Sequence, residues 1–274
     1  MKYNKLIVAL LATSVLTACG TKEEAVEEQP VEQQEEQQTI NVSAEAESFK
    51  QFTKEQMADF VADTELLAKY VNEGNVEGAQ KLFPLVTMYY ERMQPLTANF
   101  GELDQAINGA VEEGKEEEAT GFNRLAQGLF TLKNSSGFDV VVDQLVTDVK
   151  TLEQELNSLD VSQNNVLASA VLMLEQTTQR LAKTSPANNE VYAVKAQNEA
   201  VQKIIGIFTS RVEPETAKTA TEKAAILDEA VAYYEVGKED YVNYSFFTNK
   251  QKEELTKAVT DVKDALQQMN DTLK

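Results

Sequence analysis

The sequence predicts an all-α protein, built as an antiparallel up-and-down helical bundle. From about residue 49 to residue 274, apolar residues recur at the 3.6-residue spacing of amphipathic helices, and no segment of useful length alternates with period two. The breaks between these segments are short, which favours antiparallel neighbours. A helical region of this length can form one large core or two small ones, and we expect two four-helix-like halves.

The first helices are recognised from where they begin and stop. Thr53-Lys54-Glu55-Gln56 has the Ser/Thr-x-x-Glu/Gln pattern of a helix start, and Gly74 interrupts the apolar spacing that follows it. The spacing then resumes as far as Pro95. A later segment around Phe122–Phe130 ends at Asn134-Ser135-Ser136-Gly137.

The clearest amphipathic helix lies at residues 142–159, where apolar residues fall at i, i+3, i+4 and i+7 with acids and lysines between them. Ser185-Pro186-Ala187-Asn188-Asn189 is the strongest later break, and Pro186–Asn189 would mark the seam between the halves. Further helices are predicted at 99–113, 161–182, 191–209, about 214–236, and from Thr248 to residue 274.

Residues 1–19 have the parts of a bacterial export signal. Lys2 and Lys5 flank the start of a short apolar run that is too short to span a bilayer as a permanent helix. Leu16-Thr17-Ala18-Cys19 resembles the bacterial lipobox, in which the cysteine thiol receives a diacylglycerol before cleavage. We therefore expect a lipoprotein signal peptide at 1–18 and an extracytoplasmic protein anchored to the bacterial cell membrane through Cys19. The alternative, a soluble secreted protein, is disfavoured because Cys19 is the only cysteine.

Residues 19–48 form the lipidated cysteine and a predicted tether. The run is rich in glutamate and glutamine, as in Gln33-Gln34-Glu35-Glu36-Gln37-Gln38. Such a composition cannot bury enough apolar surface to offset the entropy lost on ordering. We expect a disordered segment that holds the helical domain, residues 49–274, away from the membrane.

The composition excludes several classes of chemistry. The chain contains no histidine, so serine–histidine triads and His-x-x-Glu metal helices are impossible, and acylation of Cys19 would leave no free thiol. The formal net charge of −20 disfavours nucleic acid as a partner and leaves the lipid anchor as the expected contact with the membrane.

Several segments between residues 75 and 159 occur in the same order as matching segments of a known protein family. They are Leu82-Phe83-Pro84, Tyr89-Tyr90-Glu91-Arg92-Met93-Gln94-Pro95, Phe100-Gly101-Glu102-Leu103-Asp104, Thr120-Gly121-Phe122-Asn123-Arg124-Leu125, and Asp143 to Lys150. Together they resemble the EfeO-type and imelysin-like family, while the C-terminal half is similar only in helical layout. The resemblance implies an extracytoplasmic all-α protein of two four-helix-like halves, associated with iron uptake. Some relatives bind haem or acidic polysaccharide.

The resemblance also implies a metal site, which in the family centres on a Gly-x-His-x-x-Glu helix with supporting acids. Histidine and glutamate at i and i+3 share one helix face, where facing carboxylates complete a cage for a cation. Here Glu91 and Asp104 match two of the acids. Gln94 replaces a further acid, Asn123 replaces the histidine, and Ala126 replaces the glutamate.

A later family segment rich in Glu, Tyr, His and Asp corresponds at best to Glu190 and Tyr192, without its histidine. The resemblance therefore implies a degenerate site, with no transition metal. In one interpretation Glu91 and Asp104 pair with Arg92, Arg124 or a helix end, and the former cleft is filled. In the other, Glu91, Gln94, Asp104 and Asn123 still face one cleft, and their oxygens bind a divalent cation such as calcium or the hydroxyls of a sugar.

Two functions follow from these expectations. The first is a non-enzymatic cell-surface lipoprotein that acts in binding or as an accessory to iron or cation uptake, with other iron-uptake proteins as partners. The second is a structural lipoprotein that binds another envelope protein or a cell-wall polysaccharide. No catalytic residue is predicted, and the peptidase label of the family finds no support in these residues.

Overall fold

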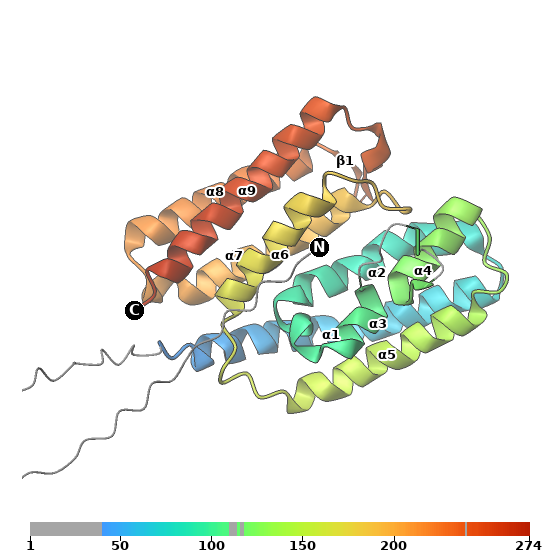
Figure 1. Cartoon of the computed structure of the whole chain (residues 1–274), viewed down its shortest axis with the longest axis horizontal. Coiled ribbons are helices and arrows are strands. Elements are labelled where there is room, and N and C mark those ends of the chain that lie inside the picture. Colours follow the sequence, from blue (N-terminus) through green and yellow to red (C-terminus); the bar gives the residue numbers. More distant parts are fainter. Residues whose placement is uncertain (1–39, 110–113, 116–117, 239) are drawn as a thin grey trace, which may run out of the picture. The chain divides into compact units, whose positions relative to one another are not determined.

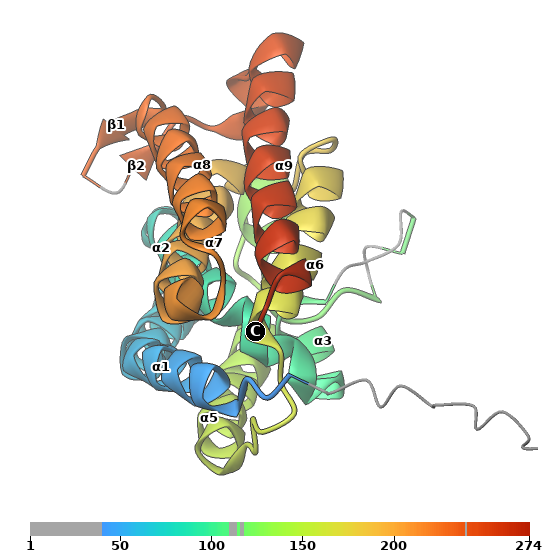
Figure 2. The ribbon, with the colours of Figure 1, turned by 90° about the vertical axis from the view of Figure 1, so that its left-hand side faces the viewer.

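The structure, a computed structural model, describes residues 40–109, 114–115, 118–238 and 240–274. These residues form the predicted all-α architecture (Figures 1 and 2). Among the described helices, none has both the length and the apolar character needed to cross a membrane. The predicted signal peptide, Cys19 and the tether as far as residue 39 lie outside the described residues. The elements are α1 (Ser43–Asn72), α2 (Val76–Thr97), η1 (Ala98–Phe100), α3 (Glu102–Asn108), α4 (Gly121–Ala126), η3, a π-helical turn (Gln127–Leu132), α5 (Asp139–Ser158), α6 (Val166–Arg180), α7 (Glu190–Phe208), η4 (Thr209–Arg211), α8 (Pro214–Ala232), β1 (Glu235–Gly237), β2 (Asp240–Tyr241), η5 (Tyr244–Phe246) and α9 (Asn249–Asp271).

The described helices form two bundles, each with its own apolar core. In the first half, α1 to α5 enclose Phe60, Phe122 and Leu145, whereas in the second half, α6 to α9 enclose Phe208 and Leu227. Figures 1 and 2 show α6 to α9 lying side by side. Helices α1 and α2 contribute to both cores, because different faces of each helix pack against different halves. The predicted fold class is confirmed.

The seam between the halves was predicted at the wrong break. The chain passes from the first half to the second at residues 159–165, between α5 and α6, whereas Pro186–Asn189 forms the turn between α6 and α7 inside the second half. Asn165 caps α6 by accepting a hydrogen bond from the Ala168 amide at 3.1 Å. A turn with one proline and two asparagines is a strong local signal, but a seam depends on which faces pack together.

The predicted start of the helical domain is also too late. Helix α1 begins at Ser43 rather than near residue 49, because Val42, Ala46 and Phe49 repeat at helical spacing and are buried in the second core. Thr53 therefore lies inside the helix, where its hydroxyl donates to the Phe49 carbonyl at 3.1 Å. The Thr53–Gln56 pattern starts no helix here, whereas Thr248 and Gln251 form a true capping box at α9.

The other predicted boundaries differ in smaller ways. Helix α2 continues through Pro84 and Pro95 to Thr97. In the segment predicted at 99–113, the described residues 99–109 hold the end of η1 and the short helix α3. The helix predicted to reach residue 236 ends at Ala232 and is followed by a two-stranded antiparallel hairpin, β1–β2.

Arg211 joins the two ends of the described chain. Its guanidinium donates to the Glu45 carboxylate at 2.6 Å, to the Asn41 carbonyl at 3.0 Å and to the Lys274 carbonyl at 2.7 Å. The start of α1 and the end of α9 therefore lie together, beside the connection between α7 and α8. The β1–β2 hairpin lies at the opposite ends of α8 and α9.

Gly121 allows a close contact between α3 and α4. Its φ is +51°, and an added Cβ would lie 2.2 Å from the Ile107 carbonyl oxygen and 2.4 Å from that of Ala106. No side chain fits there, because the obstructing atoms are backbone atoms of the preceding helix.

We expect Gly121→Ala to lower the free energy of unfolding by roughly 2–4 kcal/mol, since it combines a left-handed conformation with a backbone clash. Gly137→Ala is the matched control: its φ is +81°, but a Cβ there meets nothing within 4 Å. The control should cost only about 1 kcal/mol. Urea denaturation of the unacylated chain from residue 19, carrying Cys19→Ser, measures both values. Equal losses would contradict the close contact.

Candidate functional site

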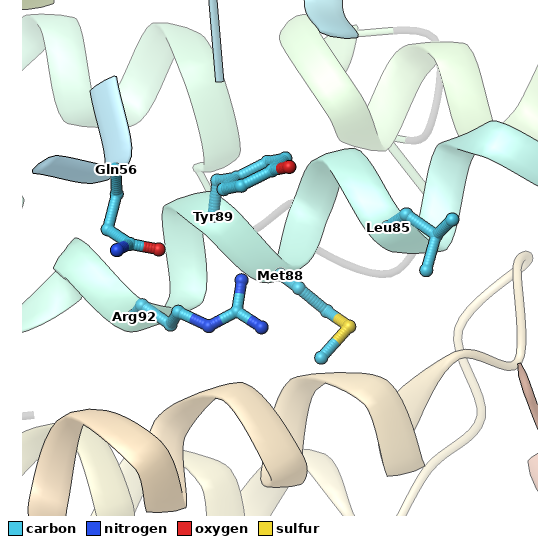
Figure 3. A pocket seen from close by; sticks show the side chains of 5 residues that line it. All are labelled: Gln56, Leu85, Met88, Tyr89 and Arg92. Atoms are coloured by element: carbon cyan, nitrogen blue, oxygen red, sulfur yellow. The ribbon is translucent and has the colours of Figure 1, made fainter. Parts of the chain in front are cut away.

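The predicted ligand positions are not in the surface groove beside α2. That groove is lined by Gln56 of α1 and by Leu85, Met88, Tyr89 and Arg92 of α2 (Figure 3). None of the four predicted cleft residues lines it. Glu91 and Gln94 lie on another face of α2, which packs against the second half.

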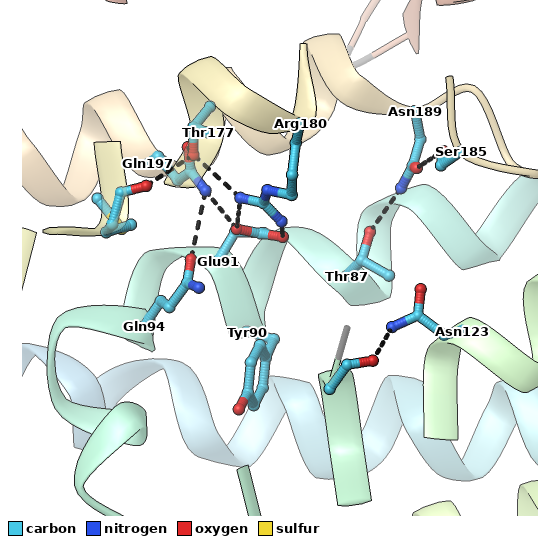
Figure 4. Close-up of polar contacts among 12 residues, drawn as sticks. Thr87, Tyr90, Glu91, Gln94, Asn123, Thr177, Arg180, Ser185, Asn189 and Gln197 are labelled. Atoms are coloured by element: carbon cyan, nitrogen blue, oxygen red, sulfur yellow. Dashed lines mark hydrogen bonds and ion pairs between the residues drawn. The ribbon is translucent and has the colours of Figure 1, made fainter. Parts of the chain in front are cut away.

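Glu91 is part of an ion pair between the two halves, in which the carboxylate is buried and the Arg180 side chain is 41% exposed (Figure 4). The Glu91 side chain is only 6% exposed, and it accepts hydrogen bonds from both terminal nitrogens of Arg180, at 3.1 and 3.3 Å. It also accepts one from the Gln197 amide at 2.5 Å. Arg180 ends α6 and Gln197 lies on α7, so these bonds hold three helices together.

Gln197 extends this pair into a network. Its amide nitrogen also reaches Gln94 at 3.3 Å, and its carbonyl oxygen accepts from the Thr177 hydroxyl at 2.8 Å. Arg180 donates to the same hydroxyl at 3.0 Å. Because Gln197 is fully buried, leaving its amide without partners would carry a large desolvation cost. Glu91 and Gln94 therefore have structural partners within the chain.

Asp104 and Asn123 lie in two other settings. The Tyr90 hydroxyl donates to Asp104, and burial raises the pKa of Tyr90, with Asp104 adding to the shift. The Asn123 amide donates to the Gly109 carbonyl at 2.8 Å and so satisfies the residue that ends α3. Ala126 is buried in the first core.

The four predicted cleft residues thus occupy three separate hydrogen-bonded settings. Figure 4 shows Arg180, Gln197 and Gln94 grouped near Glu91, with Tyr90 directed away from the group and Asn123 apart from it. In the described part of the chain, no three His, Cys, Asp or Glu side chains are placed to hold a metal ion. The internal partners also differ from those expected: Glu91 pairs with Arg180, while Arg92 pairs with Glu199 and Arg124 contacts Gln127.

Sequence reasoning missed Arg180, Thr177 and Gln197. Arg180 lies 89 residues from Glu91 along the chain, and Gln197 lies 106 residues from it. A basic residue in the last turn of a helix is also common, because it interacts favourably with the helix dipole. No local pattern connects these residues with α2.

Glu190 and Tyr192 stabilise the turns of the second half. Glu190 is 8% exposed and accepts a hydrogen bond from the Ser185 amide, but its Oε2 is buried without a hydrogen-bond partner. Burial raises the pKa of Glu190. The Tyr192 hydroxyl donates to Asp240 at 2.6 Å and accepts from the Tyr241 amide at 3.1 Å, and burial raises the pKa of Tyr192 to about 12. These residues join α7 to the turn before it and to the β1–β2 hairpin.

Comparison with known proteins found relatives of this chain. No family model matches it. An Efem/EfeO family lipoprotein of Staphylococcus haemolyticus (strain JCSC1435) is 25% identical over 283 aligned positions, covering 97% of this chain and 98% of the relative. One from Staphylococcus aureus (strain NCTC 8325 / PS 47) is 28% identical over 229 positions, covering 80% of each. The chain is a relative of the Efem/EfeO family lipoproteins.

The resemblance found in the sequence is thereby confirmed. The fold is similar to that of an imelysin-like protein from Psychrobacter arcticum 273-4, with a TM-score of 0.62 and 14% identity, covering 81% of this chain and 93% of the other. That similarity concerns the fold alone. Extracytoplasmic localisation with a lipid anchor is confirmed by the relatives, which are lipoproteins. Attachment at Cys19 itself stays a prediction.

Glu91→Gln should lower the free energy of unfolding by about 1 kcal/mol, because it removes the charged partner of Arg180 at a buried position, while solvent screens the half-exposed guanidinium. Glu77→Gln is the control, since Glu77 forms an exposed pair with Lys81 on the same helix; it should leave the urea midpoint unchanged. Adding Arg180→Gln to Glu91→Gln should cost less than the sum of the two single changes. Simple additivity would show that the pair is not coupled.

Glu190→Gln should alter how stability depends on pH. Folding raises the pKa of Glu190 above its ordinary value of 4.5, so the associated stability is fully present below pH 4.5 and is lost as pH rises through the folded value. The stability of wild type relative to the variant should therefore fall between pH 4.5 and neutrality. Urea midpoints measured across this range test the prediction, and a constant difference between the two proteins would contradict it.

Proposed function

We propose that this protein is a non-enzymatic lipoprotein of the EfeO type that acts at the cell surface in binding or as an accessory to iron or cation uptake. We further propose that the ligand positions expected from the family now have a structural role. The observation that supports this most directly is the Glu91–Arg180 ion pair, in which the best-matched acid contacts a guanidinium and a glutamine amide. A cation would have to displace Arg180 before it could bind there.

The composition and the contacts of the two best-matched acids support a non-enzymatic role in this proposal. The chain has no histidine to act as a general base, and acylation consumes its single thiol. In the described part of the chain, the carboxylates of Glu91 and Asp104 already accept hydrogen bonds from Arg180 and Tyr90. Neither is available to activate water.

A calcium site is the less favoured form of this proposal. The oxygens of four residues would have to converge within coordination distance. Instead, Glu91 and Gln94 share one hydrogen-bond network, while Asp104 and Asn123 each bind a different partner. Arg180 would also leave a positive charge beside the incoming cation.

The alternative function, interaction with an envelope protein or a cell-wall polysaccharide, is supported by a different observation. Tyr233, Val236 and Phe246 are 79%, 64% and 78% exposed, and all three lie in the connection between α8 and α9. This connection lies at the end opposite to Asn41, which is close to the start of the described chain and falls in the predicted tether. Exposed apolar side chains at such a place would suit a partner away from the membrane.

Calorimetric titration tests the proposed loss of the metal site. The chain from residue 19 carrying Cys19→Ser should show no binding heat with Fe(III)-citrate, Zn(II) or Ca(II), with citrate alone as the blank. An Asn123→His/Ala126→Glu double variant restores the Gly-x-His-x-x-Glu pattern and should gain affinity for Zn(II), whereas Asn157→His, an exposed control on α5, should not. Micromolar binding of Fe(III) or Zn(II) by wild type would overturn the proposal.

A further inference from the structure

The groove beside α2 is a cavity that the proposed function does not use. Its volume is about 330 Å³, near the lower end of the range for small-molecule sites. Four of its lining residues, Leu85, Met88, Tyr89 and Arg92, follow the i, i+3, i+4, i+7 spacing of one helix face. Gln56 of α1 forms another part of the lining, and the Arg92–Glu199 ion pair places α7 opposite α2.

Leu85 and Met88 supply the apolar part of the groove. Leu85 is partly exposed, whereas Met88 is only 4% exposed and packs in the second core. A methionine thioether is flexible and polarizable, so it adapts to apolar groups of different shape. This surface can cover a short hydrocarbon chain or a small ring.

Arg92 supplies hydrogen-bond donors that are still available. Its Nε donates to Glu199 at 2.6 Å, and its guanidinium carbon lies 5.7 Å from the centre of the Tyr89 ring. Among the described residues, nothing accepts a hydrogen bond from its two terminal nitrogens. Figure 3 shows the guanidinium directed toward Met88, beside the apolar surface. A planar guanidinium with two free terminal nitrogens matches the two oxygens of a carboxylate.

The facing helix adds positive charge. Lys195, Glu199 and Lys203 recur every four residues along α7. Lys195 pairs with Asp228 at 2.6 Å, whereas Lys203 makes no ion pair in the described part of the chain and lies 5.7 Å from the centre of the Phe52 ring.

The acids on α1 affect the other side of the groove. Asp59 and Asp63 both act on Tyr89, whose pKa is raised to about 12 by burial and, secondarily, by Asp63. The Tyr89 hydroxyl therefore stays protonated at neutral pH and is directed to Asp63. An anionic group is accordingly favoured at the Arg92 side and disfavoured at the Asp63 side.

We propose that this groove binds a small organic anion, with its carboxylate on the terminal nitrogens of Arg92 and its apolar body on Leu85 and Met88. Arg92 keeps its Nε bond to Glu199 while its terminal nitrogens bind the ligand. Lys195 and Lys203 offset the added negative charge. Gln56 can donate a further hydrogen bond from its amide. This site is separate from the Glu91 network and does not depend on whether the protein binds a metal.

Hexanoate, hexylamine and hexanol are suitable probes because they share an apolar chain and differ in charge. The unacylated chain from residue 19, with methyl-labelled Met and Leu, would be titrated with each probe by NMR. Hexanoate should shift the Met88 and Leu85 methyl signals in a saturable manner, and more salt should weaken its binding. Hexanol should bind more weakly, and hexylamine should bind least.

Arg92→Gln should weaken hexanoate binding by about tenfold or more, as expected for the loss of a charge-assisted contact. It leaves Glu199 paired with Lys195 at 3.6 Å. Leu85→Glu is an independent second variant. It adds a carboxylate at a partly exposed position of the groove and should abolish hexanoate binding. Arg124→Gln, in the first half and away from the groove, is the matched control and should leave binding unchanged. Equal binding of hexanol and hexanoate, retained affinity in Arg92→Gln, or no saturable shift at millimolar hexanoate would each overturn the proposal.

Discussion

The ion pair between the buried carboxylate of Glu91 and the half-exposed guanidinium of Arg180 is the polar interaction on which the arrangement of the two halves most depends. Each half has its own apolar core, and α1 and α2 contribute to both, but hydrophobic burial is not directional. A bidentate contact between guanidinium and carboxylate has a defined geometry. Gln197 and Thr177 then satisfy the remaining polar atoms, which limits the cost of removing the charges from water.

Helix α2 is the element that both halves share. One face packs into the first core through Phe83 and Tyr90, and another contributes Met88 and Leu96 to the second. Polar residues at the boundary between these faces have different roles: Glu91 joins α6 and α7 to the first half, while Arg92, the next residue, turns toward α7 at the groove. One helical turn therefore carries both the structural network and the proposed ligand contact.

Under the proposed function, the positions expected to hold a metal now have structural roles. A position that would coordinate a metal with histidine carries Asn123, which instead caps the end of α3, and the glutamate position carries a buried alanine, Ala126. The Asn123 amide is neutral and has an N–H donor, so it satisfies the carbonyl at the end of α3 without a metal ion. The same backbone positions thus serve stability rather than coordination.

The sequence by itself determined the fold class, most helices and the class of relatives, because these depend on local periodicity and on short motifs. It also showed that the chain has no histidine, on which the proposed loss of the metal site rests. It could not place the seam, the true start of α1 or the partners of Glu91. Pro186–Asn189 and Thr53–Gln56 are strong local signals, yet burial of Val42 and Phe49 and the packing of α5 against α1 decided those boundaries. Only the tertiary structure brought Arg180 and Gln197 to Glu91 and placed Arg92 opposite α7, because an ion pair between distant segments has no sequence period and forms only where folded helices meet.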